Sequence, residues 1–219
     1  MFSHEQVLEI FNHRYSCKEF LSQEKISESD MEIILKAGQL SPSSMGLEPW
    51  KFLVVENEAL IKELIPVTPG GAKQLATCSH LIIILSRQAK DIKHDSDYID
   101  YLLREVKKLP EETVSGFKSA IASIAKNRFN HDDQAILNYS SSQAYLAIAN
   151  MALAGSMLGI DSCMIGGFDA KAVTDILVKH HLLDPEHFSM TLMLPLGKRI
   201  GDITPKSRQP FNTVVEWVK

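Results

Sequence analysis

Five consecutive apolar residues, Leu81 to Leu85, limit the possible folds of this chain more than any other feature. Successive side chains of a β-strand point to opposite faces of its sheet. A strand that is apolar at every position is therefore covered on both faces. We predict that this run forms a strand at the centre of a sheet.

Capping residues and apolar periodicity predict helices along the rest of the chain. The first follows Ser3, which begins a capping box, and its pattern stops between residues 12 and 15. The second follows Ser27 and runs to Leu40, because Ser41 precedes a proline and avoids helical backbone. Further helices are expected over residues 59–65, 95–109 and 168–177. Two longer helices are expected over residues 111–129, with Pro110 as the first helical residue, and over residues 133–158, with a cap at Asp132 or Asp133 and with Gly159 after the end.

Apolar and β-branched runs predict further strands at residues 50–55, 162–165, 190–196 and 213–218. The chain is then an α/β or α+β protein with four or five strands, in an order that the pattern leaves open. The polar helical segments over residues 95–129 are interpreted as an insertion or lid. Because no repeat, low-complexity tract or linker divides the sequence, we expect a single domain over residues 1–219.

The composition, 45% hydrophobic in 219 residues, is that of a globular protein. No apolar run approaches the roughly 20 residues that cross a bilayer, and the N-terminus lacks the basic and apolar regions of a secretion signal. Three widely spaced cysteines argue against a disulfide framework, so we expect a cytoplasmic location. The net charge of −4 gives no reason to bind nucleic acid or an anionic membrane.

Two short segments combine cations and hydroxyl groups in a way that suits a phosphate. Arg14 and Lys18 flank Ser16 where the first helix ends, and Lys206-Ser207-Arg208 repeats the combination near the C-terminus. Either segment alone could equally be a solvated basic surface. They form a candidate phosphate site only if the fold brings them together.

Two loops have compositions that suit polar ligands. Residues 41–50 contain hydroxyl groups, a glycine and two prolines between a helix and a strand. Gly166-Gly167 lies between a strand and a helix N-terminus, where backbone N–H groups bind ligands in many α/β proteins. A plain connection and a tight turn would explain the same residues.

Several common catalytic motifs are absent from the sequence. It lacks the glycine-rich dinucleotide and P-loop spacings, the HExxH zinc motif and the GxSxG nucleophile motif. The adjacent His180 and His181 face different directions on a helix, so no metal site is expected, and Cys17 is interpreted as a passive thiol. What remains is anion-binding machinery without a catalytic side chain, which is typical of proteins whose cofactor performs the reaction.

Four segments occur in the order and spacing seen in one family. They are Arg14–Lys18, Ser41–Trp50, Ile165–Asp169 and Pro205–Pro210, and with them the chain resembles the NAD(P)H-dependent nitroreductases. The resemblance implies an α+β fold with a mixed central sheet of four to five strands flanked by helices. It also implies a homodimer with exchanged C-terminal tails, two FMN molecules at the interface, and NADH or NADPH as co-substrate.

The resemblance further assigns cofactor contacts to residues of this chain. The expected cofactor-binding residues are Arg14, Tyr15, Ser16, Lys18, Pro42, Ser43, Ser44, Gly46, Gln74, Ile165, Gly166, Gly167, Lys206 and Arg208. Arg14, Ser16, Lys206 and Arg208 would hold the phosphate and ribityl chain, and Lys18 and Gln74 would lie at the pyrimidine side of the flavin.

The other contacts would come from two loops. Residues 42–46 would reach the flavin from the other subunit, whereas Ile165 to Gly167 would pass near its N5 atom. Some family members have an amide residue at Gly46 and at Glu48, Asn and Lys near Gly71 and Gln74, and Glu at Gly166, so those side-chain contacts are not expected here.

The resulting functional prediction is an FMN oxidoreductase that passes electrons from NAD(P)H to quinones, nitroaromatics or similar small acceptors. The flavin N5 would carry the chemistry in a ping-pong cycle, so no side chain is expected to be catalytic. Two alternatives stay open on the same fold. One is a flavoenzyme with a specific substrate, as in enoyl reduction, dehalogenation or flavin breakdown, and the other is a non-catalytic FMN-binding protein.

Overall fold

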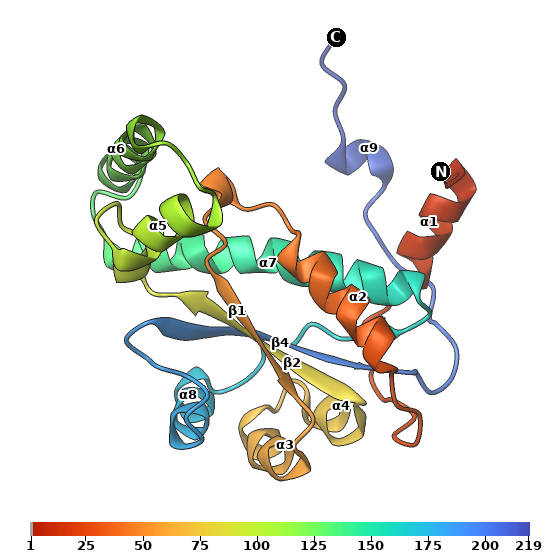
Figure 1. Ribbon diagram of the computed structural model, residues 1–219. Coiled ribbons are helices and arrows are strands. Elements are labelled where there is room, and N and C mark those ends of the chain that lie inside the picture. Colours follow the sequence, from red (N-terminus) through yellow and green to blue (C-terminus); the bar gives the residue numbers. More distant parts are fainter. Residues whose placement is uncertain (1) are drawn as a thin grey trace.

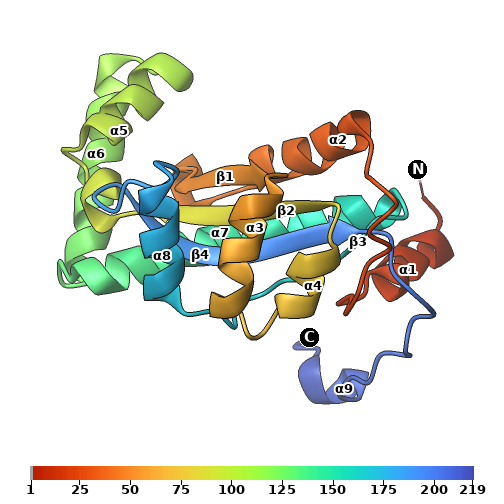
Figure 2. The same cartoon turned by 90° about the horizontal axis from the view of Figure 1, so that it is seen from below.

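A computed structural model describes residues 2–219, in which four strands form one sheet in the order β1-β2-β4-β3 (Figures 1 and 2). The strands are β1 (Trp50–Val55), β2 (His80–Arg87), β3 (Asp161–Ser162) and β4 (Phe188–Gly197). Neighbouring strands are antiparallel, and a single parallel bridge joins Ser16 to Ser162 beside β3. The expected α+β fold with a helix-flanked sheet of four to five strands is confirmed.

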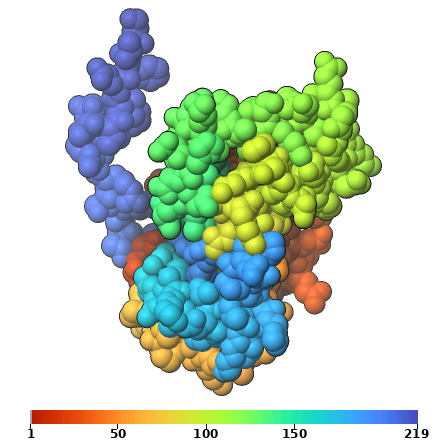
Figure 3. Space-filling model, turned by 90° about the vertical axis from the view of Figure 1, so that its left-hand side faces the viewer, coloured from red at the N-terminus to blue at the C-terminus, as the bar shows by residue number. Residues whose placement is uncertain are grey.

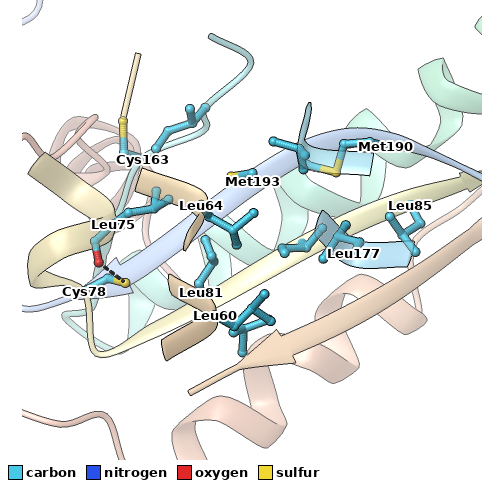
Figure 4. Packing of buried hydrophobic residues seen from close by; sticks show 14 of the residues in the cluster. Leu60, Leu64, Leu75, Cys78, Leu81, Leu85, Cys163, Leu177, Met190 and Met193 are labelled. Atoms are coloured by element: carbon cyan, nitrogen blue, oxygen red, sulfur yellow. Dashed lines mark hydrogen bonds between the residues drawn. The ribbon is translucent and has the colours of Figure 1, made fainter. Parts of the chain in front are cut away.

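The apolar run Leu81 to Leu85 lies in the central strand β2, as predicted. Its even positions, Ile82 and Ile84, pack toward α2 (Glu28–Gln39) and α7 (Asp133–Met157). Its odd positions pack on the opposite face, where Leu81 and Leu85 join Leu60 and Leu177 in one cluster (Figure 4). That face is covered by α3 (Glu58–Leu64), α4 (Ala72–Thr77) and α8 (Ala170–Lys179), as Figures 1 and 2 show. The side chains of residues 81–85 are fully buried.

Helix α7 is the longest helix in residues 2–219. Asp132 caps it by accepting the N–H groups of Gln134 and Ala135, and Gly159 follows its end with a φ of 68°. Both predicted ends of this helix are confirmed. Helix α2 approaches α7 closely at Gly38 of α2, where an added Cβ atom would lie 1.9 Å from Cε of Met151 in α7.

The segment predicted as an insertion forms a separate helical layer at one end of the sheet (Figures 1 and 2). It contains α5 (Asp97–Tyr101), the π-helical turn η4 (Leu102–Val106) and α6 (Glu111–Asn127). The prediction of Pro110 as the first helical residue is wrong. Its ψ of 150° is extended, so Pro110 is the cap that precedes α6. The helix expected over residues 95–109 is confirmed over residues 97–106, where α5 continues without a break as the π-helical turn η4.

The remaining short elements connect these layers. They are α1 (His4–His13), the 3₁₀ turns η1 (Ser44–Gly46), η2 (Ile65–Val67) and η3 (Ala89–Ile92), and α9 (Phe211–Val214). None of the helices in residues 2–219 combines the length and apolarity that a bilayer crossing requires.

Two predicted strands differ from the structure. The strand expected at residues 162–165 is interrupted after Ser162, because the Cys163 N–H donates to Pro195, which has no N–H to return the bond. Pairing with β4 resumes at Ile165, which exchanges both backbone hydrogen bonds with Met193. Residues 213–218 do not form a strand. They follow from the end of α9 in a tail that stands away from the body of the molecule (Figures 1 and 3), so no strand of residues 2–219 pairs with them.

Candidate functional site

Residues 14–18 leave the C-terminal end of α1 and run beside β3. Ser16 forms the parallel bridge with Ser162, which fixes this segment against the sheet. The C-terminal tail returns to the same place, because Lys206 Nζ donates to the carbonyl oxygen of Asn12 in α1. The fold therefore joins the two cation–hydroxyl segments that lie far apart in the sequence.

The electrostatics of this cation cluster, defined as Arg14, Lys18, Lys206 and Arg208, favour an anion. Partial burial lowers the pKa of Lys206, and the positive charges of Arg14 and Arg208 lower it further. Within residues 2–219, these four side chains form no ion pair with a carboxylate. A phosphate would supply the negative charge that the cluster lacks.

Gln74 and Lys18 lie near Cys163 at one side of the cation cluster. The amide nitrogen of the buried Gln74 donates to Cys163 Sγ at 3.8 Å. Burial raises the pKa of the Cys163 thiol, whereas the positive charges of Lys18 and Arg14 act in the opposite direction, so both cations are close to it. The structure thus brings together three of the predicted cofactor-binding side chains.

Glycines at two turns pack against each other beside this region. Gly70 N–H donates to the Gly167 carbonyl at 2.8 Å, and a Cβ atom at Gly70 would lie 2.9 Å from Gly167 Cα. Gly71 is equally constrained, since its Cβ atom would lie 2.2 Å from Cδ1 of Ile165. A Cβ atom at Gly166, by contrast, would meet no atom of residues 2–219 within 4 Å. In the exposed Gly166-Gly167 turn, Gly167 is therefore packed against Gly70, whereas Gly166 has free space beside it.

Two side chains of the first segment point into the core. Tyr15 packs against the apolar cluster that contains Leu81, and Cys17 is only 2% exposed. Burial raises the pKa of the Cys17 thiol, which also donates to the carbonyl oxygen of Glu19 at 3.0 Å. The burial and the raised pKa support the interpretation of Cys17 as a passive thiol, which stays a prediction.

The predicted loop residues 42–46 lie elsewhere in the same chain. Ser44 N–H donates to Gln143 Oε1 at 2.8 Å, which holds the loop near the middle of α7. Ser156, which contacts α1, lies 13 positions further along the helix (156 minus 143). At 1.5 Å per residue this is about 20 Å. A single chain does not bring this loop to the cation cluster.

The loop has a closed conformation of its own. Glu48 N–H donates to Ser43 Oγ at 2.9 Å, and Met45 and Glu48 have positive φ angles of 56° and 47°. Tyr98 Oη in α5 lies 2.8 Å from the carbonyl oxygen of Leu47 and 2.9 Å from that of Glu48, and its single proton is shared between these two acceptors. This tether between α5 and the loop was not apparent from the sequence.

Sequence reasoning also missed a polar network beside the cation cluster. It consists of His13, Ser156, Asp161 and Arg199, which we call the buried network. The four residues are far apart in the chain and belong to no motif. Only the packing of α1 against α7 and β3 brings them into contact.

Comparison with known proteins places this geometry in a family. Residues 12–198 match the profile described as "Nitroreductase family". A protein of Staphylococcus haemolyticus named "Putative NAD(P)H nitroreductase" is 41% identical over 215 residues, covering 98% of each chain. A Bacillus subtilis protein with the name "Putative NAD(P)H nitroreductase YfkO" is 42% identical over 215 residues and 97% of each chain. The chain therefore belongs to the nitroreductase family.

A solved structure supports the same fold. The crystal structure of a "putative nitroreductase in complex with FMN" from Exiguobacterium sibiricum is similar with a TM-score of 0.78, over 96% of each chain and at 24% identity. The predicted resemblance is confirmed at the level of family and fold.

Proposed function

We propose that this protein is an FMN oxidoreductase that uses NADH or NADPH to reduce small electron-poor acceptors. The observation that carries the proposal is the union of Arg14, Lys206 and Arg208 in one cluster without an acidic partner in residues 2–219. Family membership and the FMN-bound structural relative support the same cofactor.

The residues present suit this cofactor. Arg14, Lys206 and Arg208, with the exposed Ser16, would hold the phosphate and ribityl chain through charge-assisted hydrogen bonds. Lys18 would lie beside the pyrimidine side, where a cation stabilises negative charge on a reduced ring.

The other expected contacts come from the sheet and its turns. Gln74 would reach the same pyrimidine edge, and Ile165 to Gly167 would offer backbone N–H groups along the ring. Tyr15 would contribute through its backbone, because its side chain packs into the core.

A second copy of the chain would complete the site. Residues 42–46 lie about 20 Å along α7 from the α1 contact in their own chain, so they would reach a flavin only from a partner. The exposed tail side chains Phe211 (71%), Trp217 (78%) and Val218 (92%) and the exposed Leu8 of α1 (64%) are apolar surface that a partner would cover. We therefore propose a homodimer with exchanged tails.

The segment over residues 95–129 would cover the acceptor pocket as part of one domain. Bound FMN would accept hydride from NAD(P)H and deliver electrons to the acceptor. The protein would bind and orient both substrates in turn at one face of the flavin, which corresponds to ping-pong kinetics. Nitroaromatics and quinones are the proposed acceptors.

An absorbance spectrum of the purified protein tests the cofactor and the reaction together. We expect a yellow protein whose flavin bands bleach anaerobically with NADH or NADPH, and a panel of quinones, nitroaromatics and enones then defines the acceptor. Bound flavin that neither nucleotide bleaches would indicate a binding protein instead. A colourless protein that gains no NAD(P)H oxidation when FMN is added contradicts the proposal.

A pair of lysine variants tests the phosphate assignment. Lys206→Gln removes a cation of the cluster and should weaken FMN binding about tenfold, in keeping with one lost charge-assisted hydrogen bond. Lys171→Gln removes an exposed lysine of α8 that pairs only with Asp175, and it should leave FMN affinity unchanged. Equal effects of the two substitutions would remove the cluster from the site.

A further inference from the structure

We propose that the buried network of His13, Ser156, Asp161 and Arg199 positions the cation cluster for the phosphate of its ligand. These residues would not contact the phosphate themselves. They would fix the end of α1, from which Arg14 and Ser16 follow. The inference rests on the proposed function, because it assumes that the cluster binds the FMN phosphate.

The network begins at a buried carboxylate. The Asp161 side chain is 4% exposed, and its Oδ1 accepts a hydrogen bond from Arg199 Nη1 at 2.6 Å. Its Oδ2 accepts the backbone N–H of Arg199 at 3.1 Å. Asp161 thus neutralises Arg199 and orients its guanidinium. Arg199 differs in this respect from the unpaired cations of the cluster.

Arg199 in turn fixes the proton of His13. His13 Nε2 lies 3.3 Å from both Nη1 and Nη2 of Arg199. A guanidinium group has only donors, so Nε2 must accept and the neutral ring carries its proton on Nδ1. Nδ1 lies 3.1 Å from Ser156 Oγ and donates to it. The hydroxyl of Ser156 then donates to the carbonyl oxygen of Ile10 at 3.3 Å.

This directed chain starts in the sheet and closes on α1 itself. It joins β3 and the segment after β4 to α7 and to the last turn of α1, and each side chain in it contacts the next. Arg14 follows His13 directly, and Asn12, which precedes His13, offers the carbonyl that Lys206 contacts. Any rotation of the α1 end would therefore move two cations of the cluster relative to each other.

Stability alone does not explain the choice of residues. A buried ion pair contributes little net stability compared with an apolar contact of similar volume, because both charges lose their hydration. A network with fixed directions does provide a defined geometry, which binding sites need to within about half an ångström. Because the buried network lies next to the cation cluster, its defined geometry would hold the cations in position for a phosphate.

Two substitutions at His13 separate positioning from packing. Gln places an amide oxygen where Nε2 lies and can accept from Arg199, whereas Asn reaches only the Nδ1 position near Ser156. Flavin-free protein would be titrated with FMN and with riboflavin, which lacks the phosphate. We expect His13→Asn to lower the ratio of FMN to riboflavin affinity about tenfold, as for a displaced binding group, and His13→Gln to restore it to within about twofold of wild type.

Arg199→Lys supplies a second test, since one ammonium group cannot hold the planar contact to both Asp161 and His13. It should lower the FMN to riboflavin ratio as His13→Asn does, while riboflavin affinity stays constant. If thermal unfolding shows that His13→Asn or Arg199→Lys does not fold, Ser156→Ala, which removes no charge, takes its place. Ser156→Ala should also lower the ratio of FMN to riboflavin affinity.

The outcomes are distinct. Equal loss of FMN and riboflavin affinity in these variants, or an unchanged ratio in folded His13→Asn, Arg199→Lys and Ser156→Ala, overturns the positioning role. A wild-type protein that binds FMN no better than riboflavin overturns the proposed phosphate site, and the positioning role with it.

Discussion

Helices α6 and α7 are both long, yet a much larger share of α7 than of α6 is buried in the molecule. Of the 17 residues of α6, only Val114 and Ile121 are buried. Helix α7 has 25 residues and buries nine of them against α1, α2, η3 and the sheet. It holds the loop near Ser44 through Gln143 and the end of α1 through Ser156. From this comparison we predict that α7 fixes the distances of the site and that α6 can change its position.

Substitution of a core residue in each helix should give the largest difference. Ile148 of α7 is 1% exposed among residues of α2 and the sheet, so Ile148→Ala should cost about 2–5 kcal/mol of unfolding free energy. Ile121→Ala in α6 should cost less, because α6 can open without unfolding the sheet. Urea titrations measure both values. Equal losses would mean that α6 is as integral to the fold as α7.

Substitution of two helical glycines by alanine should change the unfolding free energy in opposite directions. Gly38→Ala places a methyl group against the buried Met151, and overpacking of about 1–3 kcal/mol should outweigh the gain in helix propensity. Gly116→Ala in α6 meets no atom within 4 Å and should stabilise the protein by about 0.5–1 kcal/mol. Thermal unfolding of the two variants gives the signs. Stabilisation by Gly38→Ala would contradict the close contact of α2 and α7.

Hydrogen exchange compares the two helices without substitution. Backbone amides of α6 should exchange at least about tenfold faster than those around Ile148, since local opening of α6 exposes little apolar surface. Saturation with FMN and an acceptor analogue should slow exchange in α6 if it covers the pocket. Exchange in α6 that is slow from the start would exclude a moving lid.

The tether between α5 and the loop should have only a small effect on stability. Tyr98→Phe removes the hydroxyl that donates to the carbonyls of Leu47 and Glu48, which should cost about 1 kcal/mol. The positive φ angles of Met45 and Glu48 depend on a well-held loop. FMN affinity should therefore fall by more than the small loss of unfolding free energy suggests. Tyr139→Phe, whose hydroxyl makes no such contact, serves as the control. Identical effects of the two variants would argue against the tether.

Local signals explain which parts of the fold were predictable. Asp132 and Gly159 mark the ends of α7 by backbone chemistry that acts within a few residues, and the uninterrupted apolar run identifies β2 in the same way. The tail at residues 213–218 has strand-like residues, yet a strand also needs a neighbour, and no neighbouring strand is present beside it in residues 2–219. The end of β3 depends on Pro195, which lies more than thirty positions away.

The candidate site also has a predictable part and an unpredictable part. The sequence predicts a phosphate site at Arg14, Ser16, Lys206 and Arg208, because the cations and hydroxyl groups of each segment lie within a few residues of one another. The buried network could not, because His13, Asp161 and Arg199 become neighbours only through packing. The predicted contacts of residues 42–46 with a flavin remain predictions, since they require a second chain.

The unequal surroundings of the two adjacent glycines have a consequence for protein engineering. A saturation library at Gly167 or Gly70 would yield mostly damaged proteins, because their backbones touch and leave no room for a side chain. Gly166 offers the opposite prospect. Its open space would accept many side chains, so a library at this one position could vary the range of acceptors of the proposed enzyme while the frame around the proposed flavin site stays intact.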